Sequence, residues 1–170
     1  MRLAQQPDSD AIAAFYRANA THLQRFAPVS EHATSPDFWP REIDQRVQDY
    51  ANGVGCKTFF FDSADERSVI GAANLHPIMR GSFQAGYLGY SIEAAKEGKG
   101  LMQEGLRLLI SFAFGPMGLH RIMANYMPAN KRSAALLGRL GFVKEGFAQR
   151  YLCINGVWED HVLTALVKRD

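Results

Sequence analysis

The sequence predicts a single α+β domain in which helices cover both faces of a mixed, mostly antiparallel central sheet. Three observations predict it: two helical patterns come first, a run of three strands follows, and a strand, helix, strand, helix and hairpin complete the chain. The 170 residues are enough for one hydrophobic core, and no linker or internal repeat divides them. We therefore treat residues 1–170 as one domain.

The first 50 residues contain the two helical patterns. Residues 1–3 have the composition of the end of a short first strand. A run of Pro, Asp and Ser at 7–10 then predicts the start of a helix, and apolar side chains recur at helical spacing over residues 10–26. The triplet Ser35-Pro36-Asp37 predicts a second helix start, and this helix continues to Tyr50.

Strands dominate the middle of the chain. Residues 58–61 and 68–75 predict two strands joined by a polar turn, and residues 86–92 predict a third. A helix over 101–114 leads to a strand over 120–127, which should lie parallel to the third strand because a helix crosses between them. A helix over 130–140 then stops at Gly141, and two final strands follow from residue 142, joined by a type I′ turn at Asn155-Gly156.

Composition excludes several classes of function. The net charge is +2 and the basic residues are scattered, so we expect no direct nucleic-acid binding. The most apolar stretch, residues 108–114, is too short to span a bilayer, and the N-terminus lacks the apolar segment of a signal peptide. Cys56 and Cys153 make neither a disulfide framework nor a metal cluster, so we expect two buried thiols in a reducing cytoplasm. The sequence leaves monomer and homodimer open.

Two glycines flank a lysine where the strand over 86–92 gives way to a helix. Unpaired N–H groups and the helix dipole attract anions at a helix start, and glycine lets a phosphate approach them. We therefore expect an anion cradle formed by Lys96, Gly98, Lys99, Gly100, Leu101 and Met102. The loop is no Walker A motif, and Gln103 breaks the dinucleotide pattern G-x-G-x-x-G. A purely structural turn would explain the glycines about as well.

Downstream of this loop, Asn130 and Ser133 open a helix that ends at Leu140-Gly141-Phe142. The order of strand, glycine loop, helix, strand and N-x-x-S helix resembles the GNAT superfamily of acetyl-CoA-dependent N-acetyltransferases. The runs RGSFQAGYLGYSIE, HRIMANYMPANKRS, RLGFVKEG and WEDHVLTAL resemble, within it, the bacterial ribosomal-protein-alanine N-acetyltransferases. The resemblance implies the GNAT fold, acetyl-CoA as cosubstrate, no metal, and transfer to the N-terminal alanine of the fifth protein of the small ribosomal subunit.

The resemblance also implies roles for individual residues. The glycine loop would bind the pyrophosphate of coenzyme A, and Asn130 would bind the pantetheine in a gap between the two parallel strands. A backbone N–H of Leu88, Gly89 or Tyr90 would stabilise the carbonyl oxygen as it becomes negative, and a bulge at Gly89 would free that group from the sheet.

Two side chains are candidates for catalysis. Ser133 would protonate the leaving thiolate, although it could instead cap its helix together with Asn130. Asp160, at the start of the last strand, would orient the acceptor amine or serve a water relay, although it could be a surface charge of the hairpin. No carboxylate occurs near Gly86, where some relatives have a glutamate base, and Leu137 stands where many have a tyrosine acid. The missing base favours an α-amine, with a pKa of about 7.7–8.0, over a lysine at about 10.4.

Two departures from the family pattern bear on the ligands. Glu97 stands where the relatives usually have glutamine, and its charge would weaken phosphate binding slightly unless it turned to solvent. The run Phe26-Ala27-Pro28 stands where they have tryptophan, glutamate and proline, so a small amine or another protein terminus is an alternative acceptor. A regulatory module that binds acyl-CoA without activity is a further alternative, which the intact Asn130 and Ser133 pair disfavours.

Overall fold

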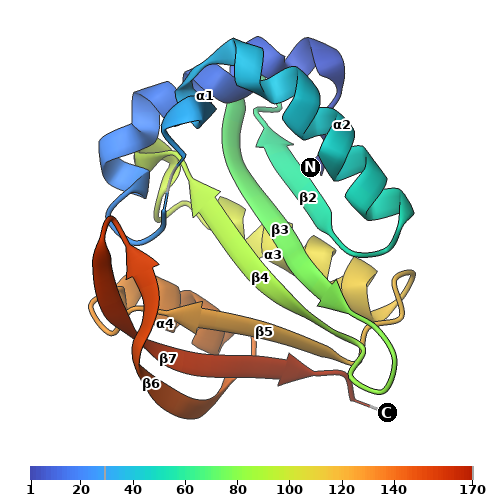
Figure 1. The fold of residues 1–170 in the computed structure, drawn as a ribbon, viewed down its shortest axis with the longest axis vertical. Helices are drawn as coiled ribbons and strands as arrows, with labels where there is room; N and C mark the ends of the chain where they lie inside the picture. Colours follow the sequence, from blue (N-terminus) through green and yellow to red (C-terminus); the bar gives the residue numbers. More distant parts are fainter. Residues whose placement is uncertain (29, 170) are drawn as a thin grey trace.

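The computed structural model describes residues 1–28 and 30–169, and these form one seven-stranded sheet flanked by helices (Figure 1). The strand order is β1-β2-β3-β4-β5-β7-β6, and all neighbours are antiparallel except β4 and β5. The strands are β1 (Arg2–Leu3), β2 (Cys56–Phe61), β3 (Val69–Met79), β4 (Ala85–Ile92), β5 (Arg121–Tyr126), β6 (Val143–Ile154) and β7 (Val157–Val167). The α-helices are α1 (Ser9–Leu23), α2 (Trp39–Ala51), α3 (Leu101–Phe114) and α4 (Lys131–Arg139). Short 3₁₀ turns are η1 (Gln6–Asp8), η2 (Glu31–Thr34), η3 (Pro36–Phe38) and η4 (Ala94–Lys96). The predicted α+β class and order of elements are confirmed.

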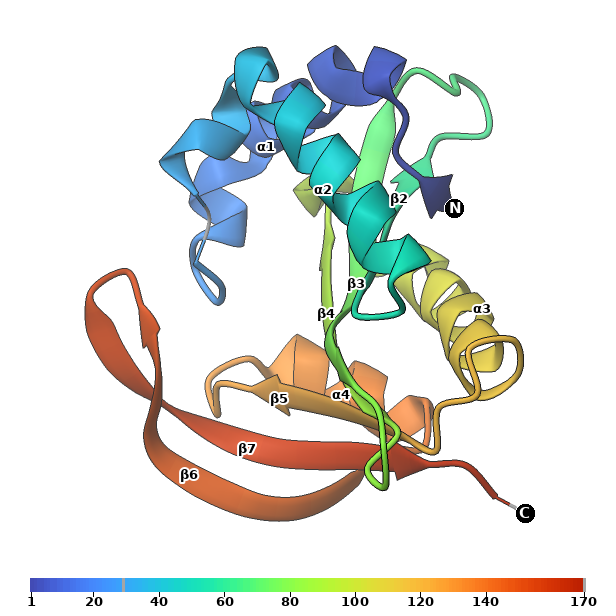
Figure 2. The same ribbon diagram turned by 45° about the vertical axis from the view of Figure 1, so that its right-hand side comes forward.

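Helices α1 and α2 cover one face of the sheet, over β2 and β3 (Figures 1 and 2). Their buried side chains include Ile12, Trp39 and Ile43, which pack with Phe59 of β2. The indole of Trp39 meets the Phe59 ring edge-on, with centroids 5.9 Å apart, and its Nε1 donates to the carbonyl of Ala33 at 3.0 Å. Burial of these large side chains fixes α2 against the sheet.

Helix α1 ends at Leu23, three residues earlier than the predicted end at Phe26. Arg25 and Phe26 therefore belong to the loop that follows the helix, and this loop forms part of a cavity wall. The apolar pattern ran on past the helix end because Phe26 faces the cavity rather than the core.

Helices α3 and α4 cover the opposite face of the sheet (Figure 1). Leu106 and Leu109 of α3 pack with Leu75 and Ile122 of the strands, and all four side chains are fully buried. Gly105 lets α3 approach the sheet closely, because a Cβ atom at this position would lie 2.4 Å from Cζ of Phe60. No helix within the described residues is long and apolar enough to cross a bilayer.

Strands β4 and β5 are parallel, as predicted, but they pair only over residues 85–87 of β4 and 121–123 of β5. Strand β4 continues to Ile92 and β5 to Tyr126, so the two strands diverge beyond this short contact. Beyond this contact, the edges of β4 and β5 that face each other are not paired, so a gap lies between two central strands of the sheet.

The predicted bulge at Gly89 is wrong. Gly89 pairs in register with Asn74, and the register shift between β3 and β4 lies between Leu75 and Ile78 of β3. A bulge is unnecessary on β4, because its divergence from β5 already leaves the edge beyond Tyr87 without that partner strand.

The β6–β7 hairpin has the predicted type I′ turn, with positive φ angles of 51° at Asn155 and 82° at Gly156. The Nδ2 atom of Asn155 donates to the carbonyl of Gln24 at 2.7 Å, which ties the tip of the hairpin to the end of α1. One sequence expectation fails here: Cys56 is buried, but Cys153 on β6 is exposed.

Candidate active site

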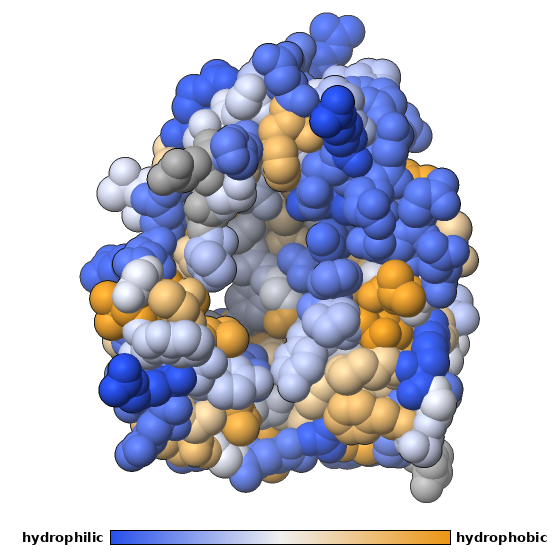
Figure 3. Space-filling view, in the orientation of Figure 1, coloured by the Kyte–Doolittle hydropathy of each residue, from blue (hydrophilic) through white to orange (hydrophobic). Residues whose placement is uncertain are grey.

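A cavity of about 1070 Å³ opens where β4 and β5 diverge. Its walls come from the end of α1 and the following loop, from β4, from the start of α3, from the end of β5 and from α4. The hollow is visible on the molecular surface in Figure 3. The volume is at the upper end of the range typical of small-molecule sites, so the cavity can hold a large ligand.

The glycine loop forms one wall of this cavity. Gly98 and Gly100 have φ angles of 73° and 80°, in the left-handed region that favours glycine, and a Cβ atom on either would meet nothing within 4 Å. Gly100 is the residue before α3, so the first N–H groups of the helix, on Leu101 and Met102, have no partner within the helix. Bare backbone, free donors and the helix dipole are the features that an anion cradle requires, and anion binding by this loop stays a prediction.

The two lysines of the loop lie differently. Lys96 lines the cavity, but its Nζ atom is 2.5 Å from Oδ2 of Asp62, and this hydrogen bond lowers the pKa of Asp62 and raises that of Lys96. Lys96 therefore anchors the loop to the end of β2. Lys99 is exposed and does not line the cavity.

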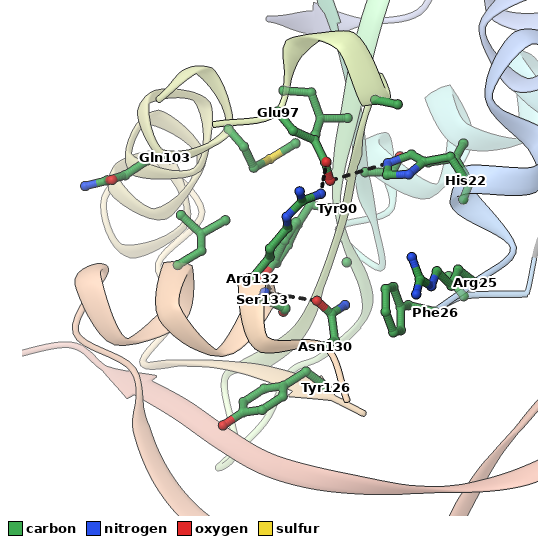
Figure 4. A pocket seen from close by; sticks show the side chains of 18 of the residues that line it. His22, Arg25, Phe26, Tyr90, Glu97, Gln103, Tyr126, Asn130, Arg132 and Ser133 are labelled. Atoms are coloured by element: carbon green, nitrogen blue, oxygen red, sulfur yellow. Dashed lines mark hydrogen bonds and ion pairs between the residues drawn. The ribbon is translucent and has the colours of Figure 1, made fainter. Parts of the chain in front are cut away.

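Glu97 lies at the cavity rim and is met by two basic side chains (Figure 4). One carboxylate oxygen pairs with Arg132 of α4, and the other lies 3.5 Å from Nε2 of His22. We expected this carboxylate to weaken phosphate binding unless it turned to solvent. The structure shows a third arrangement, in which Arg132 offsets the charge of Glu97 and the loop is linked to α4.

A hydroxyl pair lies on the cavity wall where β4 faces the start of α4. Oγ of Ser133 and Oη of Tyr90 are 2.6 Å apart. Oδ1 of Asn130 accepts from the backbone N–H of Ser133 at 3.1 Å, so Asn130 is the N-cap of α4 and the Ser133 hydroxyl is not used for capping. Burial raises the pKa of Tyr90 to about 12, so the phenol remains protonated at neutral pH and can donate to Ser133. The proton of Ser133 is then available to a group in the cavity.

Comparisons with known proteins identify the family of the domain that contains this cavity. A family model described as an acetyltransferase (GNAT) domain matches residues 1–143.

The chain belongs to the GNAT acetyltransferase family.

Several relatives of this GNAT chain share its whole length. It is 44% identical over 171 residues to the [Ribosomal protein uS5]-alanine N-acetyltransferase of Escherichia coli, with all of this chain and 88% of that protein covered. Among solved structures, the ribosomal-protein-S5-alanine acetyltransferase of Vibrio fischeri superposes with a TM-score of 0.95 at 38% identity, covering 99% of this chain and 92% of that one. RimJ of Mycobacterium smegmatis, solved in complex with CoA-disulfide, shares the fold with a TM-score of 0.90 at 24% identity, covering 98% and 80%.

Most of the expected site residues of the acetyltransferase line the cavity. The residues that do so are Leu88, Gly89, Tyr90, Lys96, Gly98, Gly100, Leu101, Met102, Asn130 and Ser133. Asp160 does not belong to the cavity wall, and its Oδ1 atom accepts from the backbone N–H of Arg150 at 2.8 Å. Arg150 has a φ angle of 48° at an irregularity in β6, so Asp160 stabilises the hairpin there. This position favours the alternative that Asp160 is a structural charge of the hairpin.

Sequence reasoning missed the partners of these residues. It included Tyr90 for its backbone and overlooked its hydroxyl, and it gave no role to Arg132 or Arg25, which also line the cavity. The N-K-R-S run was a usable signal for Arg132, because this residue lies between Asn130 and Ser133, two predicted site residues at the start of α4. No group of three His, Cys, Asp or Glu side chains in the described ranges is placed to hold a metal ion.

Proposed function

We propose that this GNAT protein transfers an acetyl group from acetyl-CoA to the N-terminal α-amine of a protein, with the N-terminal alanine of ribosomal protein uS5 as acceptor. The observation that carries the proposal is the 44% identity, over the whole chain, to the Escherichia coli enzyme with that name. A ribosomal acceptor places the reaction in the cytoplasm.

The cavity fits acetyl-CoA in two respects. The cradle at Gly98 and Gly100 offers backbone donors to a diphosphate, and Arg132 and Arg139 of α4 add positive charge to the wall. The gap between β4 and β5 continues from this cradle to the hydroxyl pair, which is the course an extended pantetheine chain would take. Acetyl-CoA supplies the activated acetyl group as a thioester.

The residues around the gap would bind the pantetheine, stabilise the carbonyl oxygen and protonate the leaving sulfur. The Nδ2 atom of Asn130 makes no hydrogen bond to any described residue, so it can bind an amide of the pantetheine. The edge of β4 beyond Tyr87 offers backbone N–H groups to the carbonyl oxygen as negative charge develops on it. As the C–S bond breaks and the C–N bond forms, Ser133 gives its proton to the sulfur, while Tyr90 holds the Ser133 oxygen. The proton that the nitrogen loses on becoming an amide returns to the Ser133 oxygen through water, so the hydroxyl is restored for the next turnover.

The acceptor amine must lose a proton, and the cavity favours this without a dedicated base. Among the side chains that the structure describes, its lining includes four permanent cations, Arg25, Lys96, Arg132 and Arg139, against one carboxylate, Glu97. Asp62, outside the lining, compensates Lys96, and Glu97 compensates Arg132, so the excess positive charge comes from Arg25 and Arg139. A positive environment disfavours the ammonium form and lowers the pKa of a bound amine. An α-amine with a pKa of about 7.7–8.0 starts close enough to neutrality to be deprotonated by water.

Release of CoA thiol from acetyl-CoA tests the proposal. The acceptor is a peptide with the N-terminus of uS5, and the control is the same peptide with its α-amine blocked. We expect release with the free peptide alone. Equal release from the blocked peptide would identify a side-chain acceptor, and turnover of small amines in place of both peptides would show that the acceptor is wrong.

A further inference from the structure

Arg25 lies in the loop after α1, on the cavity wall that faces α4 (Figure 4). Ser133 and its N-cap Asn130 lie at the start of α4, Tyr90 lies on β4, and the glycine cradle lies between β4 and α3. Arg25 also lines a second, smaller hollow together with Gln24 and Asn155, where the hairpin tip meets the end of α1. Arg25 thus occupies the part of the cavity wall that continues into the hollow beside the hairpin tip.

The charge of Arg25 is available, unlike those of the other cations of the cavity. Lys96 is paired with Asp62, Arg132 with Glu97, and Nε of Arg139 donates to Gln103 at 3.2 Å. Within the described residues, Arg25 makes no ion pair or hydrogen bond, and its guanidinium lies over the ring of Phe26, 5.5 Å from the centroid. A residue that normally forms forked hydrogen bonds with carboxylates is therefore presented without one.

None of the side chains that the structure describes offers an anion to Arg25. Among them, the wall of the cavity contains a single carboxylate, Glu97, and both of its oxygens are already met by Arg132 and His22. An acceptor with a basic side chain near its amine would meet uncompensated positive charge at this point. An acceptor with an acidic side chain would complete the pair.

We propose that Arg25 is a specificity residue that binds an acidic side chain within the first few residues of the acceptor, just beyond the amine that is acetylated. The proposal rests on the proposed function, because it requires a peptide whose first residue lies at the hydroxyl pair. An extended chain advances about 3.3 Å per residue, so positions two to four of the acceptor pass along this wall. Arg25 thereby selects acidic N-terminal segments and disfavours polybasic ones.

The test is a peptide series that begins with alanine and carries glutamate, glutamine or lysine at positions two, three and four in turn. The measurement is kcat/KM for each peptide at low salt. The wild-type protein should have a kcat/KM about two- to fivefold higher for glutamate than for glutamine at one or more positions, which is the effect expected of a partly exposed ion pair. The preference should be lost in Arg25→Gln, reversed toward lysine in Arg25→Glu, and reduced by added salt. Arg41→Glu is the matched control: Arg41 is exposed on α2, away from the cavity, and the substitution changes the net charge equally.

Three outcomes overturn the inference: indifference of the wild-type protein to peptide charge at all three positions, a preference that survives in Arg25→Gln, or an equal change in Arg41→Glu. A raised KM for acetyl-CoA in Arg25→Gln with unchanged peptide preference would place Arg25 on the cosubstrate instead. Failure of the proposed function looks different, because no alanine peptide would then be acetylated whatever its charge.

Discussion

Tyr90→Phe tests the hydroxyl pair, because it removes one oxygen and keeps the aromatic ring. The lost hydrogen bond, 2.6 Å between Oη and Oγ of Ser133, has a net value of about 0.5–1.5 kcal/mol, which corresponds to about a 2- to 13-fold effect on a rate. We therefore expect kcat to fall by that factor and KM for the peptide to stay the same. Ser133→Ala removes the acid itself and should lower kcat by about 100-fold, the low end for general acid catalysis.

The double variant decides whether the two hydroxyls act together. If Tyr90 acts through Ser133, Tyr90→Phe should have no further effect in a Ser133→Ala background. The assay is thiol release at saturating acetyl-CoA and peptide. The matched control is Tyr126→Phe, which removes a phenol of the same cavity that is not hydrogen-bonded to Ser133. Independent, multiplying effects in the double variant would refute the relay, as would an equal loss in Tyr126→Phe.

Three further predictions concern glycines and the cavity rim. Gly100→Ala should weaken CoA binding in calorimetry, because φ is 80° and a side chain there strains the backbone conformation of the loop, whereas Gly138→Ala on α4, with free space around it, should leave the affinity unchanged. Gly105→Ala should lower the free energy of unfolding by about 1–3 kcal/mol in a denaturant titration, since its Cβ would lie 2.4 Å from the Phe60 ring, and a smaller side chain at position 60 should restore part of the loss. Glu97→Gln should tighten CoA binding by up to about fivefold at low salt, because Arg132 is released toward the phosphates; weaker binding would mean that the Glu97 pair is needed to hold the loop.

The parts of the fold that follow from local patterns were predicted well. Asn155 and Gly156 both tolerate the positive φ angles that a type I′ turn requires, so the turn could be predicted from these two residues. The glycines before α3 likewise adopt positive φ angles, so they indicate where the helix begins. The end of α1 was misplaced because Phe26 is apolar for the cavity rather than for the core. Apolar periodicity in a sequence indicates which side chains avoid water. It does not distinguish a side chain packed in the core from one that lines a ligand cavity.

The contacts that define the site could not be predicted from local patterns. Tyr90 and Ser133 are 43 residues apart in sequence, and their hydrogen bond depends on how far β4 and β5 diverge. Asp160 is a second example, because its position near the start of the last strand gave no sign that the backbone N–H of Arg150, ten residues earlier, would donate to it. Register shifts such as the one in β3 likewise depend on the pairing of whole strands.

Strands β4 and β5 touch only at their short paired segment, so a change in the angle between them moves their far ends the most. Strand β4 continues for five residues beyond Tyr87, a distance of about 17 Å, so a change of about 10° in the angle between the strands would move Ile92 by about 3 Å. Gly86 lies in this contact, and a Cβ atom there would lie 3.3 Å from Cγ1 of Ile78 and 3.5 Å from Cδ1 of Leu119. A bulkier residue at position 86 would press on this apolar packing, so a substitution far from any substrate can change the width of the gap and thereby which substrates fit.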